Sequence, residues 1–184
     1  IAGSLGANGF YLGLIAEIGS TGIVRNINLT NVTGQLTTSI GGDWIGTIAG
    51  VNFGTISKAS ANGSITIIGS GYDIGGLVGD NDGIIVESAS SVEVTGRSYN
   101  ELAYGGQGRL GGVAGINLGT IRLSFSTGVV DGAGTFDGSE IGGLVGINGG
   151  EIAQADAGGS GTGNYSLAGA LIGQDSGGYV DQTF

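Results

Sequence analysis

Short apolar segments alternate with glycines along the whole chain, and the same pattern returns several times. Four copies align from their first glycine and read GTIAGVNFGTISKASANGSITIIG, GGLVGDNDGIIVESASSVEVTG, GGVAGINLGTIRLSFSTGVVDG and GGLVGINGGEIAQADAGGSGTG. Their marker glycines, Gly50, Gly79, Gly115 and Gly146, are separated by 29, 36 and 31 residues. A partial copy at Gly173 and a divergent copy from Leu12 make about six. Such periods indicate a solenoid, a propeller or an array.

Each copy is predicted to form three short strands and no helix. The first strand is GGLVG, the second is GTIRLSFS and its equivalents, and the third is the apolar alternation SITI, SVEV or GVV. Three strands without a helix fit one turn of a parallel β-helix, whose strands stack about 4.8 Å apart. We therefore expect an all-β, right-handed parallel β-helix of about six coils, with residues 1–184 as one solenoid segment.

Equivalent positions of the copies form columns that would stack through the coils. The columns predicted to point inward are Ile56, Ile85, Ile121 and Ile152; Ala59, Ser88, Ser124 and Ala155; and Ala61, Ser90, Ser126 and Ala157. A neighbouring column varies freely, as is typical of an outward position: Lys58, Glu87, Leu123 and Gln154. Loops of unequal length are expected where the third strand leads into the next copy, the longest from Gly96 to Leu110.

One further column is polar. Its members are Asn52, Asn81, Asn117, Asn148 and Asp175. Asparagine at such a position can adopt the left-handed backbone conformation and bond to neighbouring backbone groups. Stacked through the coils, their amides would form a ladder with a structural role.

The amino-acid composition excludes several classes of function. The chain has 44 glycines, no proline, cysteine or histidine, and a net charge of −10. Its five basic residues are dispersed, so no basic stripe is available for nucleic acid. Without cysteine and histidine, disulfides, thiolate metal sites and the usual general base are excluded. No apolar run approaches the ~20 residues of a membrane helix, and we expect an excerpt of a longer chain that carries its targeting signal elsewhere.

The repeat resembles the GLUG motif, through the pattern G-G-L-V-G-x-N-x-G-T-I-x-x-S-x-A-x-G-x-V. The copies at Gly75, Gly111 and Gly142 match it best, and the opening copy departs from it with Ala16 at the marker position. Such arrays occur in secreted bacterial filamentous-haemagglutinin-like adhesins and exoproteins and in accessory regions of IgA-cleaving peptidases. The resemblance implies a secreted or surface-displayed solenoid and carries over no catalytic residue.

Two motifs suggest small ligands but lack parts of the sites they resemble. GQGRLG, from Gly106 to Gly111, matches a dinucleotide fingerprint, but a repeat strand follows it where a helix should open. Asp80 and Asp82 suggest a calcium loop, but Ala89 stands where such a loop needs glutamate. Adventitious calcium at the clustered carboxylates and a solvated acidic face both remain open.

Polysaccharide-cleaving β-helices use carboxylates and basic groups in a groove. The candidates here lie in the longer insertions: Arg97, Glu101, Arg109, Asp131, Asp137 and Glu140. Tyr72, Tyr99 and Tyr104 lie near the same loops and could stack on sugars, although ordinary loop packing is the favoured interpretation. None of these residues recurs from copy to copy, so a role in surface solubility is the main reading. Ice binding would need an outward threonine ladder, which Ile84 and Glu151 interrupt.

We assign no catalytic, cofactor-binding or metal-binding residue, and we expect a protein that is not an enzyme. The expected function is a structural β-solenoid rod of a bacterial adhesin, exoprotein or extracellular fibre, at the cell surface or outside the cell. Further repeats of the chain or other copies, stacked end to end, are the expected partners, with host or matrix glycans as a further class. The alternative is a carbohydrate-active or carbohydrate-binding β-helix that uses the loop carboxylates and tyrosines.

Overall fold

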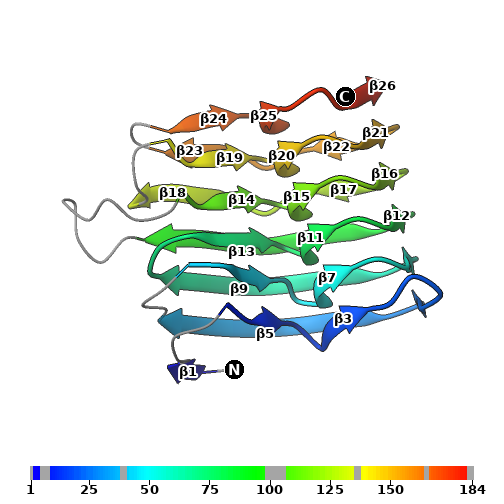
Figure 1. Cartoon of the computed structure of the whole chain (residues 1–184), viewed down its shortest axis with the longest axis horizontal. Coiled ribbons are helices and arrows are strands. Elements are labelled where there is room, and N and C mark those ends of the chain that lie inside the picture. The colour runs from blue at the N-terminus through cyan, green and yellow to red at the C-terminus, as the bar shows by residue number, and fades with distance from the viewer. Residues whose placement is uncertain are drawn as a thin grey trace.

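The protein is described by a computed structural model that covers residues 2–4, 9–37, 41–97, 107–134, 138–163 and 166–181. These residues form an all-β solenoid of about five turns, with four parallel sheets along its length (Figure 1). Neighbouring strands in each sheet come from successive repeats, and they pair in parallel. Within the described residues there is no helix, and so none that is long and apolar enough to cross a membrane.

Sheet A contains β1 (Ala2–Ser4), β5 (Asn28–Thr37), β9 (Ser60–Ile68), β13 (Ala89–Arg97), β17 (Phe125–Ser126), β18 (Val130–Gly134), β22 (Asp156–Ala157) and β23 (Gly161–Gly163). Sheet B contains β2 (Tyr11–Leu12), β6 (Asp43–Ile45), β10 (Tyr72–Gly75), β14 (Arg109–Gly111), β19 (Glu140–Gly142) and β24 (Leu167–Gly169). Sheet C contains β3 (Ile15–Ile18), β7 (Ala49–Asn52), β11 (Val78–Asn81), β15 (Ala114–Asn117), β20 (Val145–Asn148) and β25 (Ile172–Asp175). Sheet D contains β4 (Ile23–Arg25), β8 (Thr55–Ser57), β12 (Ile84–Val86), β16 (Thr120–Arg122), β21 (Glu151–Ala153) and β26 (Tyr179–Asp181).

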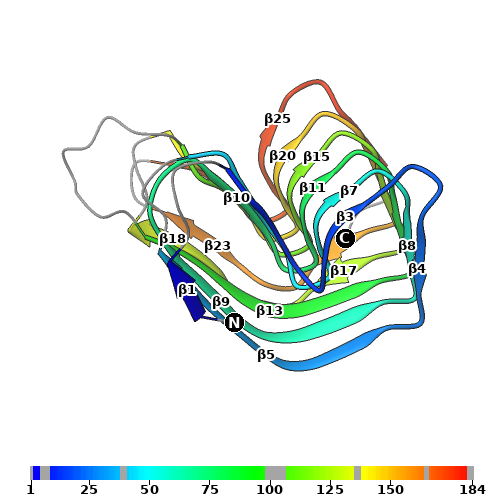
Figure 2. The same cartoon turned by 60° about the horizontal axis from the view of Figure 1, so that its bottom comes forward.

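Each turn therefore contributes to four sheets, where the sequence predicted three strands. The segment GGLVG is not one strand, because the chain bends between β10 and β11 at Gly75, Gly76 and Leu77. A Cβ atom on Gly75 would lie 2.6 Å from the Cα of Ala114, so the next turn leaves room only for glycine. Figure 2 shows this re-entrant bend, at which sheets B and C run side by side.

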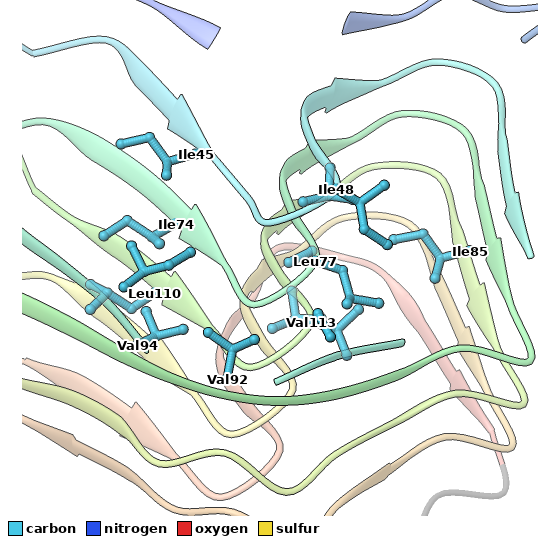
Figure 3. Close-up of a cluster of buried hydrophobic side chains, with 14 of the residues drawn as sticks. Ile45, Ile48, Ile74, Leu77, Ile85, Val92, Val94, Leu110 and Val113 are labelled. Carbon is cyan, nitrogen blue, oxygen red and sulfur yellow. The ribbon is translucent and has the colours of Figure 1, made fainter. Parts of the chain in front are cut away.

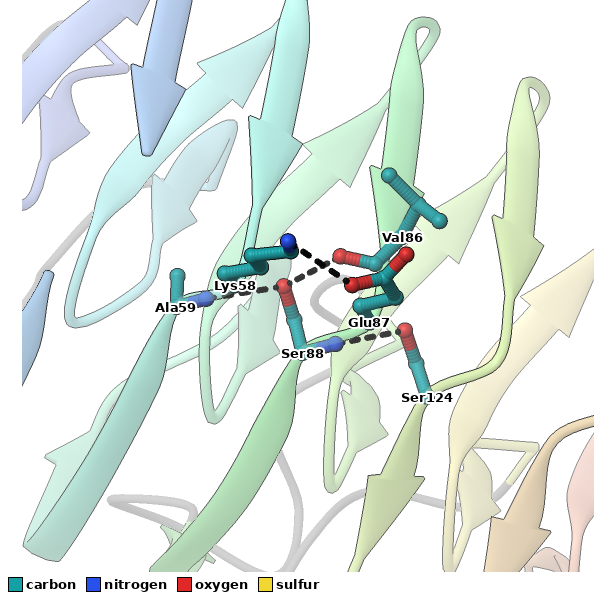
Figure 4. Close-up of polar contacts among 6 residues, drawn as sticks. All are labelled: Lys58, Ala59, Val86, Glu87, Ser88 and Ser124. Atoms are coloured by element: carbon teal, nitrogen blue, oxygen red, sulfur yellow. Dashed lines mark hydrogen bonds and ion pairs between the residues drawn. The ribbon is translucent and has the colours of Figure 1, made fainter. Parts of the chain in front are cut away.

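The second predicted strand is also divided in two. Its corner is the column Lys58, Glu87, Leu123 and Gln154, whose φ angles are 51°, 50°, 50° and 51°. These side chains are exposed, as expected. The left-handed backbone conformation, which asparagine could have adopted in the ladder, occurs here and not at the ladder asparagines. The corner is stabilised between turns (Figure 4): Ser88 Oγ accepts the Ala59 N–H at 3.2 Å, and Lys58 pairs with Glu87 at 3.6 Å.

The core follows the predicted columns. Ile56, Ile85, Ile121 and Ile152 are paired in register through sheet D, and none of them is exposed. Ile45, Ile74 and Leu110 stack along sheet B, and Ile48, Leu77 and Val113 stack at the bend (Figure 3). The two columns of small residues are buried as predicted, except that Ala157 is only partly covered.

The amide ladder is confirmed, and it is fully buried from Asn52 to Asn148. The side chains of Asn52, Asn81 and Asn117 each donate to the side-chain oxygen of the next asparagine at 2.8 Å. Asn148 donates to Asp175 Oδ1 at 3.1 Å. Because each buried amide finds its partner one turn away, the ladder fixes the register of the coils.

The connections of unequal length lie where they were predicted, between the end of sheet A and the start of sheet B. Only three residues separate β9 from β10, whereas β13 and β14 are separated by the segment 98–108. Most of the Gly96–Leu110 insertion lies outside the described residues.

The outermost coils expose apolar side chains at positions that the central coils bury. In the isoleucine column, Val180 of β26 is 40% exposed, whereas its neighbour Ile152 is fully buried. At the opposite end, Leu14 is 59% exposed, and it borders an apolar cavity of about 190 Å³ between the first coils. The apolar core is therefore open toward both ends of the described solenoid.

Candidate functional site

The outer face of sheet B carries a group of charged and aromatic side chains. The strands alternate, so Ile45, Ile74 and Leu110 enter the core while the residues before them point outward. Strand pairing aligns these outward residues in one column, which we call the sheet B column: Tyr11, Trp44, Asp73, Arg109, Glu140 and Leu167. Four successive repeats thus place an aromatic ring, an acid, a base and an acid next to one another along the column.

Arg109 joins the two carboxylates of the column. Its Nη1 lies 3.0 Å from Asp73 Oδ1, within hydrogen-bond distance, and its Nε lies 3.9 Å from Glu140 Oε2. The longer contact is an ion pair without a hydrogen bond, and Glu140 Oε2 has no other bonding partner. The side chains of Asp73 and Glu140 are 5% and 6% exposed, whereas Arg109 is 34% exposed. The guanidinium is therefore held by buried acids and reaches solvent.

Sheet C forms the wall opposite the sheet B column, and its marker glycines allow the close approach. A Cβ atom on Gly115 would lie 2.7 Å from the Ile74 nitrogen and 2.9 Å from the Arg109 oxygen, both on sheet B. Both contacts are with backbone, which cannot move aside, so the marker glycines are required wherever the two sheets meet. This close contact buries the acidic groups of the column.

Burial dominates the electrostatics of the group. It raises the pKa of Asp73 to about 6, although the Arg109 guanidinium opposes this shift. Burial also raises the pKa of Asp80, on the adjacent sheet C strand, to about 7, with further increases from the charges of Asp82 and Asp73. The pKa of Glu140 is raised for the same reason. Burial therefore makes the charged forms of these acids less favourable than they are in water.

A polar pocket of about 590 Å³ opens beside the column. It is lined by Gly41, Gly42, Trp44, Gly71, Asp73, Gln107 and Arg109. Tyr11 packs edge-on against Trp44, with ring centroids 5.3 Å apart and planes at 66°, which fixes the indole at the pocket wall. The indole Nε1 is buried and has no hydrogen-bond partner. The pocket thus combines a held aromatic ring with a fixed acid–base pair.

The structure brings together only some of the residues that the sequence singled out. Arg109 and Glu140 meet at the column, whereas Arg97 and Asp131 form a separate pair at 3.9 Å on sheet A. Tyr72 is 1% exposed and packs over Gly108 inside the solenoid, where burial raises the pKa of its hydroxyl. Asp137, Glu101, Tyr99 and Tyr104 lie outside the described residues.

Sequence reasoning missed Trp44 and Asp73, and it considered Asp80 only as a calcium ligand. A signal was present, because each column residue stands two positions before the glycine that opens a repeat. The four segments read WIG, DIG, RLG and EIG from Trp44, Asp73, Arg109 and Glu140. Alternating charges at equivalent places of adjacent repeats predict a contact across coils.

The two motifs that suggested small ligands form strands and a turn of the repeat. Asp80 lies in β11 and Asp82 on the exposed turn after it, and no three acidic side chains of the described residues gather as metal ligands do. The last residues of GQGRLG form β14, with Arg109 in the sheet B column.

Comparisons with known proteins give one partial likeness. No protein-family model matches the sequence, and no solved structure matches it significantly. Among curated proteins, Halomucin from Haloquadratum walsbyi (strain DSM 16790 / HBSQ001) is 35% identical over 83 residues. The matched stretch is 45% of this chain and 1% of Halomucin, so this chain is similar to a small part of a far longer protein.

Proposed function

We propose that the chain is a structural β-solenoid rod, displayed at a bacterial cell surface or secreted, as part of an adhesin, exoprotein or extracellular fibre. In this proposal the solenoid is a right-handed GLUG-type array of about six coils, and it does no catalysis. Right-handed crossover is the usual hand for parallel strands in one sheet. The rod would act by display, by adhesion or by stacking on further coils.

One observation carries this proposal: the same inter-coil contacts recur from coil to coil through sheets C and D. The asparagine ladder crosses four turns with 2.8 Å bonds, and the isoleucine column runs beside it. Each coil contacts its neighbours, so further coils could be added without changing those already present. Such a body is stiff and extendable, as a rod requires.

The likeness to Halomucin supports the same reading. Halomucin is so long that 83 residues are 1% of it. A segment similar to this chain therefore exists inside a very long polypeptide, the setting that a repeat rod needs. The similarity supports a structural role for the segment and names no activity.

Surface exposure tests the proposal directly. Antibodies raised against residues 1–184 should label intact cells of the encoding organism or its culture medium. Brief protease treatment of intact cells should remove the signal, while an internal enzyme of the same cells should survive as the control. Antigen that appears only after the cells are broken would contradict the proposal.

The catalytic alternative has less support from the described residues. Arg97 and Asp131 are paired with each other, and the two carboxylates of the sheet B column share the Arg109 guanidinium. Both acids contact the same guanidinium, an arrangement that suits the binding of a polar ligand.

A further inference from the structure

We propose that the pocket beside the sheet B column binds a neutral saccharide, with one sugar ring on the Trp44 indole and its hydroxyls on Asp73, Arg109 and Gln107. This inference does not depend on the rod function. It rests on the pocket of about 590 Å³ and on the residues that line it. That volume falls within the ~300–1,000 Å³ that small-molecule sites occupy.

The chemistry of the lining points to a sugar. A sugar ring presents C–H groups on a face and hydroxyls around its edge, so it needs an aromatic surface beside both donors and acceptors. Trp44 supplies the surface, Asp73 the acceptor and Arg109 the donors.

The geometry is set before any ligand arrives. Asp73 and Arg109 hold each other at 3.0 Å on paired strands, and Tyr11 packs against the indole. Three of the seven lining residues are glycines, so a ring can approach the backbone there without meeting side chains. Trp44, Asp73 and Arg109 lie on β6, β10 and β14, so the part of the site that they form loses little conformational freedom when it binds.

The charge balance indicates a neutral ligand. Asp73, Asp80 and Glu140 surround the single guanidinium of Arg109, and the whole chain carries −10. A uronic acid, a sulfated sugar or a phosphate would meet this negative field with one base that is already paired. A neutral sugar would use the same hydrogen-bond groups without that repulsion.

The protein offers a direct reporter, because Trp44 is its only tryptophan. We expect neutral oligosaccharides of glucose, galactose or mannose to change the indole fluorescence in a saturable way. They should also protect it from a soluble quencher. Matched oligosaccharides that contain uronic acids or sulfate should have at least ten-fold weaker effects. Stronger binding of the anionic series would overturn the proposal.

Matched variants locate the site by calorimetry, which does not need the indole. Arg109→Lys keeps the charge but loses the planar fork, and it should weaken binding at least ten-fold. Arg122→Lys, the same change at an exposed position of sheet D, should leave binding unchanged. Gln107→Ala, at an exposed pocket residue, should weaken binding without affecting folding. Binding that survives both pocket variants, or no saturable binding of any neutral sugar, would refute the inference.

Discussion

At the scale of single residues, the buried asparagines are the most demanding side chains of the fold. Asn117 accepts from Asn81 and donates to Asn148, both at 2.8 Å, and it is fully buried. Replacing it with an apolar residue leaves one donor and one acceptor unpaired inside the protein. Each orphaned group costs about 1–3 kcal/mol.

We therefore predict that Asn117→Ala lowers the free energy of unfolding by about 2–4 kcal/mol, as measured by denaturant titration. The matched control is Asn62→Ala. Asn62 also bonds across coils, to the Asn31 N–H at 2.8 Å, but it is exposed. This control should cost less than about 1 kcal/mol. Equal effects of the two variants would show that the buried ladder has no special role.

Asp80 gives the stability a defined dependence on pH. Its folded-state pKa of about 7 lies above the ~3.9 of an unfolded aspartate. The folded protein thus holds a proton that the unfolded chain has lost, and stability falls as the pH rises between these two values. Asp82, Asp73 and Arg109 are the charged groups that act on it.

We expect Asp80→Asn to stabilise the protein by about 1–2 kcal/mol above pH ~7, because it removes a partly buried charge. The gain should disappear near pH ~4, where the native carboxyl is already protonated. Thermal unfolding at both pH values measures the effect. Glu93→Gln, an exposed change of the same kind on β13, should give no comparable gain. A gain that is independent of pH would contradict the assigned cause.

At the scale of elements, the contact between sheets B and C determines the cross-section of the solenoid. The marker glycines lie where the backbones of the two sheets touch, and the bend at Gly75 and Gly76 places the sheets side by side. The same contact buries the acids of the sheet B column. Fold and candidate site therefore depend on one packing feature.

We predict that Gly115→Ala destabilises the protein by about 3 kcal/mol or more, since its Cβ would meet three backbone atoms within 2.9 Å. Gly19→Ala is the control, because nothing lies within 4 Å of the added atom. It should leave the melting temperature almost unchanged or raise it slightly. If both variants melt alike, the close contact of the two sheets is wrong.

At the scale of the whole molecule, the open ends predict association. Parallel strands at a solenoid end leave backbone groups unpaired, and the outermost coils expose Leu14 and Val180. We expect residues 1–184, expressed alone, to form short axial rods at high concentration. The association should increase with salt, which screens the repulsion between chains of charge −10. Light scattering measures it.

A pair of leucine variants distinguishes axial stacking from general adhesion. Leu14→Lys places a charge at the open end and should reduce association. Leu118→Lys makes the same change on the side of the rod, where Leu118 is 56% exposed, and should not. A protein that stays monomeric at high salt would disprove the stacking model, and equal effects of the two variants would disprove its axial direction.

The sequence by itself determined the repeat, the parallel stacking and the columns. Equivalent residues recur one coil apart, so the positions of Ile85 and Ile121, and of Asn81 and Asn117, could be aligned by inspection. A solenoid makes this possible because its long-range contacts are always between equivalent positions of adjacent repeats. The pattern of burial then follows from the alternation along each strand.

Only the tertiary structure decided how each coil is bent. Lysine, glutamate and leucine have no preference for the left-handed conformation, so nothing in Lys58, Glu87 or Leu123 announces the corner between sheets D and A. The bend at Gly75 and Gly76 could not be predicted either. Glycine favours bends, but it is so frequent in this chain that one pair of glycines carries little information.

The candidate site could not be predicted from the sequence, because it too depends on how each coil is bent. The column of Trp44, Asp73, Arg109 and Glu140 could have been aligned from the sequence, but its burial could not, because the covering wall is sheet C. The contact of that wall depends on the bend, which the sequence did not reveal. Local pattern therefore fixed which residues stack, and the path of the backbone within each turn decided which of them form a pocket.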